Sequence, residues 1–316
     1  MDFKEPLFYA KILLFGEYGI IKNSKALSIP YNSFKGVLKI GLELDDTNFI
    51  KSNQSLKDFH DYLSLKQTGQ EVIVRFDLDS FSQDISRGLY FESTIPQGYG
   101  VGSSGALVAA IYERYAIDKI DISKELNKEV LLKLKHIFSY MESFFHGNSS
   151  GLDPLNSYLS LPILINSKDD VKTAGIPKQM QHNKSGVVFL IDSGLVGQTE
   201  PMVHLFMEKM KQEGFRNMLK NHFIKHTNNC VDDFLKGNVS SLFSNIKELS
   251  NLALCHFSPM IPSEFHKLWK KGIESNDYFL KLCGSGGGGY ILGFAPDFEK
   301  AKQKLYPHKL ELVYHF

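Results

Sequence analysis

The sequence predicts a protein of mixed α-helix and β-sheet that folds as two domains. A chain of 316 residues is longer than a single hydrophobic core usually spans. In both halves, short apolar runs typical of strands alternate with longer segments whose apolar residues recur every three or four positions. A polar run over 166–186, with Pro177 inside it, separates the halves. The predicted domains are therefore residues 1–180 and 181–316.

The first half is predicted to begin with strands and to continue with helices. Apolar runs predict strands over 10–15, 37–44, 72–78 and 88–94, with a further strand starting at Ile20 after the turn 16–19. The composition of 45–70 indicates a loop or a short helix. Apolar periodicity predicts helices over 104–116 and 123–145, the second ending at Gly147. A short helix should start at Asp153 as cap and Pro154, followed by a strand over 161–165.

The second half is predicted to interleave strands with helices. Strands are expected over 187–191, 278–282, 290–294 and 310–314, and helices over 203–218, 223–235, 239–254, 262–274 and 296–305. This pattern also indicates a mixed domain with its own sheet.

Charge and composition favour a small-molecule partner. The 36 basic and 35 acidic residues give a net charge of +1, so no long-range field favours nucleic acid or an anionic membrane. The three cysteines form no CxxC unit, and no apolar stretch approaches the length of a membrane span. Residues 1–11 lack the basic region and apolar core of a signal peptide. We expect a soluble, cytoplasmic protein that binds neither nucleic acid nor membrane.

A glycine-rich loop from Pro96 to Ala106 leads directly into an apolar helix. The first amide groups of a helix have no internal partner, and glycines let the backbone approach an anion closely. The loop therefore predicts a phosphate site, and hence a nucleotide. The alternative is an ordinary turn in which Ser103 or Ser104 caps the helix.

Two common nucleotide motifs do not account for this loop. The Walker pattern GxxxxGK[ST] is absent from the sequence. Residues 100–105 satisfy GxGxxG, but a dinucleotide site needs a strand directly before the first glycine and an acidic residue closing the next strand. Neither condition holds here, and residues 284–289 satisfy the same pattern. A nicotinamide-dependent dehydrogenase is therefore disfavoured.

Three ionisable residues are ambiguous when each is taken alone. Lys11 lies within an apolar strand, where an ammonium group needs an anion unless it reaches solvent at the strand edge. Glu142 lies one position past the apolar stripe of its helix, where a solvated or salt-bridged carboxylate is ordinary. Asp153 precedes Pro154 at a helix start, where capping explains it.

Together with the loop, these residues resemble the GHMP kinases, the superfamily of galactokinase, homoserine, mevalonate and phosphomevalonate kinases. Three motifs occur in the family's order: 11–18, 96–106 (similar to PxxxGLGSSAA) and 281–289. The resemblance implies an α+β fold, with an N-terminal domain like domain 2 of ribosomal protein S5 that binds ATP, and a C-terminal ferredoxin-like α/β sandwich. It also implies ATP and Mg²⁺ as cofactors, and it admits a homodimer.

Within that superfamily the sequence is most similar to the mevalonate kinases. Residues 146–153 resemble their HGxPSGxD segment, Glu142 precedes Asp153 by 11 positions, and Asp192-Ser193-Gly194 is followed by Thr199. There are departures from the family pattern. Tyr9-Ala10 replaces Pro-Gly, Tyr18 replaces a His on the acceptor side, Gly105 replaces an Ala, and Ser149 replaces a Pro.

The resemblance assigns a role to each motif. Asp153 would accept or orient the acceptor hydroxyl proton, Lys11 would pair with Asp153, and Ser104 and Glu142 would hold Mg²⁺. The ATP phosphates would lie against Pro96, Gly98, Gly100, Val101, Gly102, Ser103, Ser104, Gly105 and Ala106. The acceptor would lie against Glu17, Tyr18, His146, Ser150, Thr199, Gly284, Ser285 and Gly286.

The predicted function is ATP-dependent phosphorylation of a small-molecule hydroxyl, with mevalonate converted to 5-phosphomevalonate in isoprenoid synthesis. Other members of the superfamily remain alternatives: phosphomevalonate kinase, diphosphomevalonate decarboxylase or a sugar kinase. Segments 15–21 and 192–199 contain no Lys or Arg, which favours an acceptor of little charge. A non-catalytic nucleotide-binding regulator on the same fold is a further alternative, disfavoured because Lys11, Glu142 and Asp153 are all present.

Overall fold

The structure is a computed structural model of the chain. It describes residues 5–41, 47–69, 72–123, 125–147, 149–177 and 186–316. The chain forms two compact units that alternate along the sequence. The first comprises Met1–Lys11, Pro30–Pro96 and Gly102–Leu161, and the second comprises Ile12–Ile29, Gln97–Val101 and Pro162–Phe316. The predicted boundary between 180 and 181 lies outside the described residues and stays a prediction.

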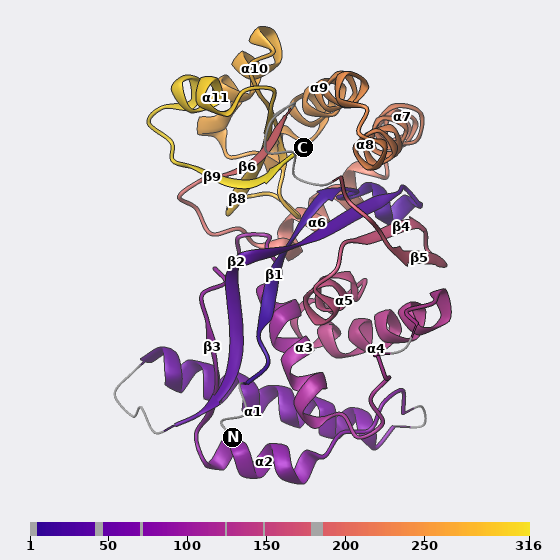
Figure 1. Ribbon diagram of the computed structural model, residues 1–316, viewed down its shortest axis with the longest axis vertical. Helices are drawn as coiled ribbons and strands as arrows, with labels where there is room; N and C mark the ends of the chain where they lie inside the picture. The colour runs from indigo at the N-terminus through magenta and orange to yellow at the C-terminus, as the bar shows by residue number, and fades with distance from the viewer. Residues whose placement is uncertain (1–4, 42–46, 70–71, 124, 148, 178–185) are drawn as a thin grey trace. The chain divides into compact units, whose positions relative to one another are not determined.

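The first unit is mainly helical. Its helices are α1 (Thr47–Gln67), α2 (Leu78–Ser86), α3 (Ser103–Tyr115), α4 (Lys128–His146) and α5 (Leu152–Leu159). The end of β2 (Ala26–Ile40) pairs antiparallel with β3 (Leu89–Ser93), with Gly36 opposite Ser93. The first residues of β1 (Phe8–Phe15) also belong to this unit. Helices α3, α4 and α5 pack against one another, as Figure 1 shows.

Helix α4 shows how local sequence defines these elements. The predicted apolar stripe is buried at Leu134, Ile137 and Met141, in keeping with the helical period. The helix starts later than predicted because the Asn127 side chain accepts a hydrogen bond from the Val130 amide and caps it there. It ends at Gly147, as predicted, in a backbone conformation with φ of 67°.

Two other predictions for the first unit are wrong. The segment predicted as a strand over 72–78 makes one isolated bridge, Phe76 to Ala116, and leads into α2, whose N-cap is Asp77. The segment predicted as a loop or short helix over 45–70 contains the 21-residue helix α1. Its apolar residues Leu56, Phe59 and Leu63 follow helical spacing and are fully buried, so tertiary packing stabilises a helix that composition alone did not indicate.

The second unit contains an antiparallel sheet in the order β7-β8-β6-β9. Its strands are β6 (Val187–Asp192), β7 (Phe279–Leu282), β8 (Tyr290–Ala295) and β9 (Leu310–His315). Helices α6 to α10 connect β6 to β7, and α11 connects β8 to β9. This β-α-β-β-α-β arrangement is ferredoxin-like, and the mixed architecture confirms the predicted fold class.

The helices of the second unit follow the predicted pattern, except that the single helix predicted over 203–218 is two helices, α6 and α7, separated by a break at 210–212. They are α6 (Thr199–Lys209), α7 (Glu213–Met218), α8 (Ile224–Lys236), α9 (Val239–His256), α10 (His266–Ser275) and α11 (Phe298–Leu305), with short helical turns η2 (Leu219–Phe223), η3 (Ser258–Met260) and η4 (Ser263–Phe265). Strand β8 is buried along its whole length, and α9 packs on β7. Among the described residues, no helix is both long and apolar enough to cross a membrane.

Part of the N-terminal chain also belongs to the second unit. The start of β2 pairs with β4 (Ile163–Ser167), Ala26 lying opposite Ile165, and β4 pairs with β5 (Asp170–Thr173). The strand predicted to start at Ile20 is instead a helical turn, η1 (Gly19–Lys22). Tyr18 and Asn23, on either side of the turn, have φ of 57° and 62°. Such left-handed residues interrupt an extended strand.

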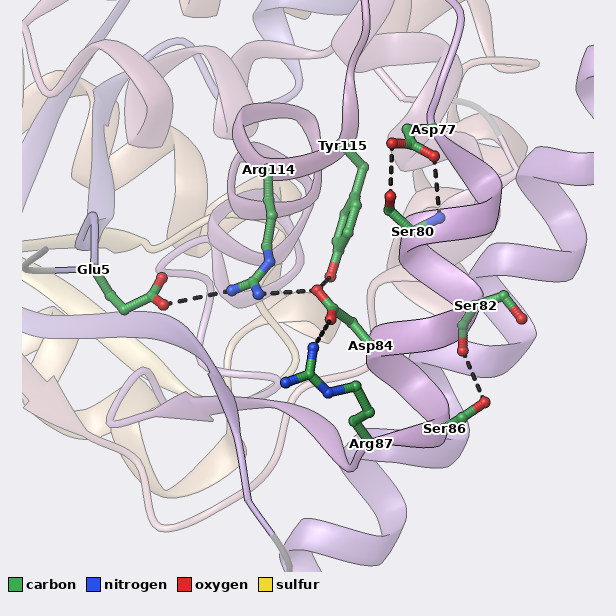
Figure 2. Close-up of polar contacts among 9 residues, drawn as sticks. All are labelled: Glu5, Asp77, Ser80, Ser82, Asp84, Ser86, Arg87, Arg114 and Tyr115. Carbon is green, nitrogen blue, oxygen red and sulfur yellow. Dashed lines mark hydrogen bonds and ion pairs between the residues drawn. The ribbon is translucent and has the colours of Figure 1, made fainter.

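A polar cluster of the first unit connects α2 to α3. Asp84 accepts hydrogen bonds at 2.9 Å from both Arg114 and the Tyr115 hydroxyl. Figure 2 shows Arg114 also directed toward Glu5, at 3.5 Å. The Asp84 side chain is only 14% exposed, whereas Arg87, which approaches it at 3.5 Å, is 70% exposed. Asp84 is therefore the residue on which this cluster depends.

We predict that Asp84→Ala lowers the free energy of unfolding by about 1–3 kcal/mol, because Arg114 and Tyr115 lose a shared, largely buried acceptor. Denaturant unfolding of the purified protein measures the change. Arg87→Ala is the matched control and should cost less than about 0.5 kcal/mol, since exposed ion pairs contribute little. Equal losses for the two variants would contradict this account.

Candidate functional site

Helix α3 begins at the glycine-rich loop without a side-chain cap. Its N-cap residue is Gly102, with φ of 82° and no side-chain capping bond. The capping interpretation of Ser103 and Ser104 is therefore wrong, because they are the first and second residues of the helix itself. The first intrahelical bond runs from the Ala106 amide to the Gly102 carbonyl at 3.1 Å. The preceding amide groups of the helix are of the kind that binds anions.

Two glycines bring this helix start close to its neighbours. A Cβ atom on Gly102 would lie 2.9 Å from Cγ of Lys11, and one on Gly105 would lie 2.7 Å from the backbone carbonyl carbon of Asp153. Both distances are too short for a real side chain. Gly105, which departs from the family pattern, is thus required by the close approach of α5 in this chain.

Lys11 and Asp153 form a buried ion pair in the first unit. The ammonium nitrogen of Lys11 lies 2.9 Å from Oδ1 of Asp153, and Lys11 is 3% exposed. Its side chain therefore does not reach solvent at a strand edge. Asp153 is the second residue of α5, whose N-cap is Gly151, so the predicted capping role of Asp153 is also wrong. About a third of its side chain, 34%, is exposed, which leaves the carboxylate accessible to a ligand.

Glu142 is buried between two serine hydroxyl groups. Ser104 donates to Oε1 of Glu142 at 3.2 Å, and Ser149 donates to Oε2. Glu142 is 3% exposed, so it is not a solvated helix residue. Burial, and secondarily the negative charge of Asp153, raise the pKa of Glu142 to about 8. Two carboxylates and one lysine leave the cluster short of positive charge.

This cluster fits a hard divalent cation. Mg²⁺ prefers oxygen ligands and usually takes only one or two of them from the protein, with phosphate and water as the others. Ser104 and Glu142 supply such a pair. No group of three or more His, Cys, Asp or Glu side chains able to hold a metal occurs in the part of the chain that the structure describes.

Two more residues predicted for the acceptor, His146 and Ser150, lie in segment 146–153. His146 is the last residue of α4, and Asn148 lies outside the described residues. The Ser150 hydroxyl accepts from the Leu152 amide at 3.3 Å at the start of α5. Ser149, which replaces the family's Pro, was not predicted as a site residue. Its hydrogen bond to Glu142 follows from tertiary contact, and no pattern in the sequence signals it.

A second cluster, in the second unit, contains half of the residues predicted for the acceptor. The Tyr18 hydroxyl donates to the Ser285 carbonyl at 2.6 Å, and the Ser285 hydroxyl donates to Oγ1 of Thr199 at 3.4 Å. Glu17 forms an ion pair with Lys281, and both side chains are buried. We call Glu17, Tyr18, Thr199, Lys281 and Ser285 the tyrosine cluster. The glycines on either side of Ser285, Gly284 and Gly286, have φ of 67° and 74°.

The first half of the glycine-rich loop packs within the second unit. A Cβ atom on Gly100 would lie 2.5 Å from the Cys283 carbonyl oxygen, and one on Gly98 would lie 2.5 Å from Cγ1 of Val196. Val101 is 1% exposed. Pro96, the last residue before this stretch, is half-buried in the first unit. The close contacts explain why glycine recurs through 98–102.

The glycine-rich loop and the following helix match a known domain family. The family described as "GHMP kinases N terminal domain" matches residues 70–160, a range that includes Ser104, Glu142 and Asp153. Comparison with curated protein sequences finds no match. Together with the fold, the family match confirms the resemblance to the GHMP kinases.

Solved structures of the same fold cover the chain almost completely. The L. major mevalonate kinase in complex with R-mevalonate has a TM-score of 0.63 at 17% identity and covers 99% of this chain and 96% of its own. A Streptococcus pneumoniae phosphomevalonate kinase with phosphomevalonate and AMPPNP has 0.61 at 13%, covering 99% of each. A Lactococcus lactis galactokinase with galactose has 0.61 at 12%, covering 98% and 92%.

The raised pKa of Glu142 predicts that the metal-free protein loses stability as the pH rises. The folded protein keeps the Glu142 proton up to about pH 8, whereas an unfolded chain releases it near the ordinary pKa of 4.5. The folded state therefore binds more protons in this range, and its free energy of unfolding falls between these two pH values.

We expect a loss on the order of 3 kcal/mol between pH 5 and 8, measured by thermal and denaturant unfolding in a metal chelator. Glu142→Gln should remove most of this pH dependence and stabilise the metal-free protein at pH 8. Glu129→Gln, at an exposed position of the same helix, should retain it. The same slope in the Glu142 variant would show that another group is responsible.

Proposed function

We propose that the chain is an ATP-dependent kinase that transfers a phosphoryl group to the hydroxyl of a small molecule, with mevalonate as the acceptor. The observation that carries the proposal is the buried Lys11–Asp153 ion pair, at 2.9 Å, within the same unit as the Ser104–Glu142 pair. Phosphoryl transfer depends on positioning and on neutralising charge. The first unit offers a carboxylate, a cation and a set of helix amide groups for these tasks.

Asp153 would accept or orient the proton of the acceptor hydroxyl. Its carboxylate is partly exposed and lies 2.9 Å from the Lys11 ammonium group. A carboxylate serves as a general base only while it is ionised. Lys11 would also attract the oxygen of the acceptor and the transferred phosphoryl group.

The start of α3 would bind the nucleotide. The amide groups after Gly102 and the glycine backbone of the loop suit phosphate oxygens, since the positive end of the helix dipole lies there. Ser104 and Glu142 would hold Mg²⁺, whose chemical contribution is to neutralise charge on the phosphate oxygens. Ser149 would keep the Glu142 carboxylate oriented through its hydrogen bond.

The choice of mevalonate rests on sequence motifs and on local charge. The related structures contain mevalonate, phosphomevalonate and galactose at TM-scores of 0.61 to 0.63, so the fold alone does not select among acceptors. The resemblance of 146–153 to mevalonate kinases favours mevalonate. In the tyrosine cluster, Lys281 forms an ion pair with Glu17, so its ammonium group already has an anionic partner within the protein. That supports an acceptor without a phosphate group.

One assay separates the candidate functions. ADP release would be measured with Mg-ATP and each of mevalonate, phosphomevalonate, diphosphomevalonate, homoserine and galactose. We expect turnover with mevalonate and formation of 5-phosphomevalonate, identified by mass spectrometry. Turnover with another acceptor would reassign the substrate and keep the kinase. Nucleotide binding without turnover on any acceptor would favour a non-catalytic regulator.

We predict that Asp153→Asn lowers kcat by roughly 10²–10⁴-fold, the usual contribution of a general base, while the KM for ATP changes less than threefold. Steady-state kinetics, with the acceptor that the ADP-release assay identifies, measures both constants. Asp169→Asn, at an exposed turn position, is the control and should match the wild type. Retained turnover in the Asp153 variant would remove this residue from the mechanism.

We predict that Ser104→Ala raises the Mg²⁺ concentration needed for half-maximal activity by roughly 10- to 100-fold, as loss of a metal-site oxygen does. Titration of Mg²⁺ at fixed ATP measures the requirement. Ser86→Ala is the control, because this hydroxyl donates only to the Ser82 carbonyl of its own helix, at 2.9 Å (Figure 2). An unchanged requirement would mean that Ser104 does not bind the metal.

A further inference from the structure

Tyr18 occupies an unusual position in the turn after β1. It is a non-glycine residue with φ of 57°, a conformation uncommon for residues with large side chains and unfavourable in energy. The side chain is nevertheless buried, with 5% exposure. A bulky residue persists in such a conformation only when surrounding contacts outweigh the strain. The contacts of Tyr18 therefore indicate what this residue does.

Those contacts reach two segments far away in the sequence. The hydroxyl donates to the Ser285 carbonyl at 2.6 Å, across 267 positions. The ring stacks on Phe206 with centroids 4.7 Å apart and contacts Phe257 at 5.7 Å. Phe206 belongs to α6. Ser285 belongs to a second glycine-rich segment, the loop 284–289, which is distinct from the loop at 96–106. Tyr18 thus joins the turn, the loop and a helix of the same unit.

The neighbouring residue strengthens the same connection. Glu17 forms its buried ion pair with Lys281, at the end of β7, while Tyr18 binds Ser285 four residues later. Two consecutive side chains therefore hold the turn against one short segment. Five glycines, at 284 and 286–289, give that segment high intrinsic freedom. Backbone hydrogen bonds from Gly287 to Met260 and from Gly289 to Leu195 hold the end of the loop, and the Tyr18 hydroxyl holds its beginning at Ser285.

Ser285 connects Tyr18 to Thr199. The Ser285 hydroxyl lies 3.4 Å from Oγ1 of Thr199, the first residue of α6. Phe206, stacked under the Tyr18 ring, lies two turns further along the same helix. The tyrosine therefore binds Ser285 directly and contacts the helix of Thr199 through Phe206. Burial raises the pKa of Tyr18 above its usual range, so the hydroxyl remains a donor at neutral pH.

We propose that Tyr18 is a positioning residue that fixes Ser285 and Thr199 as one preformed surface for recognising the acceptor. It acts through these two residues and does not itself bind the acceptor. Glu17 also helps to position this surface, because its carboxylate forms an ion pair with Lys281. The proposal rests on the proposed kinase function and deepens it: acceptor affinity would depend on a hydrogen bond that the acceptor never touches.

The test compares Tyr18→Phe with Tyr278→Phe. The first variant keeps the ring stacking and removes only the hydroxyl. The second removes an equivalent bond, because the buried Tyr278 hydroxyl donates to the Leu268 carbonyl at 2.8 Å in the same unit. Amide hydrogen exchange and steady-state kinetics are measured for both variants and the wild type.

We expect Tyr18→Phe to raise the KM for the acceptor about tenfold, in line with loss of one buried hydrogen bond. kcat and the KM for ATP should change less than threefold. Exchange over 284–289 should accelerate at least tenfold without substrate. Tyr278→Phe should leave acceptor KM and this exchange unchanged.

Three outcomes would overturn the inference. Unchanged exchange over 284–289 in Tyr18→Phe would show that the hydroxyl does not hold the loop. Faster exchange with an unchanged acceptor KM would separate the loop from recognition. A fall in kcat alone would place Tyr18 in the chemical step. The exchange experiment needs no substrate, so an inactive wild-type protein would contradict the kinase proposal while the role of Tyr18 in ordering the loop remained separately testable.

Discussion

The first unit is organised around a lysine that is buried within a strand. An ammonium group removed from water costs several kcal/mol unless an anion compensates for it, and Asp153 lies 2.9 Å from Lys11. The neighbouring backbone must therefore come very close. Gly102 and Gly105 have no side chain that would collide with Lys11 and Asp153. At Gly151, the N-cap of α5, a Cβ would lie 2.2 Å from a carbonyl oxygen of α4. These glycines therefore allow the close backbone approach on which the ion pair depends.

Burial raises the pKa of the neighbouring Glu142 carboxylate, and the negative charge of Asp153 in the ion pair adds to this effect. Asp153 forms the direct ion pair with Lys11, while Glu142 is buried nearby and has a raised pKa of about 8. Ser104 and Ser149 donate hydrogen bonds to the Glu142 carboxylate, yet burial outweighs them. One cation thus serves two carboxylates. A divalent ion at Ser104 and Glu142 would supply the missing charge, so the electrostatics of the protein alone and the proposed need for Mg²⁺ have one cause.

Sequence patterns predicted the fold well where the signal was local and less well where packing decided. The apolar runs of β1, β6 and β8 and the stripe of α4 give strong periodic signals, and these elements form. The helix α1 was underestimated because its polar composition obscures the buried residues Leu56, Phe59 and Leu63. The strand expected at Ile20 fails because Tyr18 adopts a left-handed conformation. Its tertiary contacts stabilise that conformation, and no local propensity indicates it.

The candidate site shows the same division between local motif and distant partner. Lys11, Ser104, Glu142 and Asp153 were predicted because their types and order match a family pattern, although the caps assigned to Asp153 and the loop serines were wrong. The partners of Glu142 and Glu17, namely Ser149 and Lys281, were not predicted. Tyr18 meets Ser285 across 267 positions, and spacing cannot indicate such a contact. If the motifs carry phosphoryl transfer, acceptor choice rests on these long-range pairs, and chains with the same motifs can then differ in the acceptor they phosphorylate.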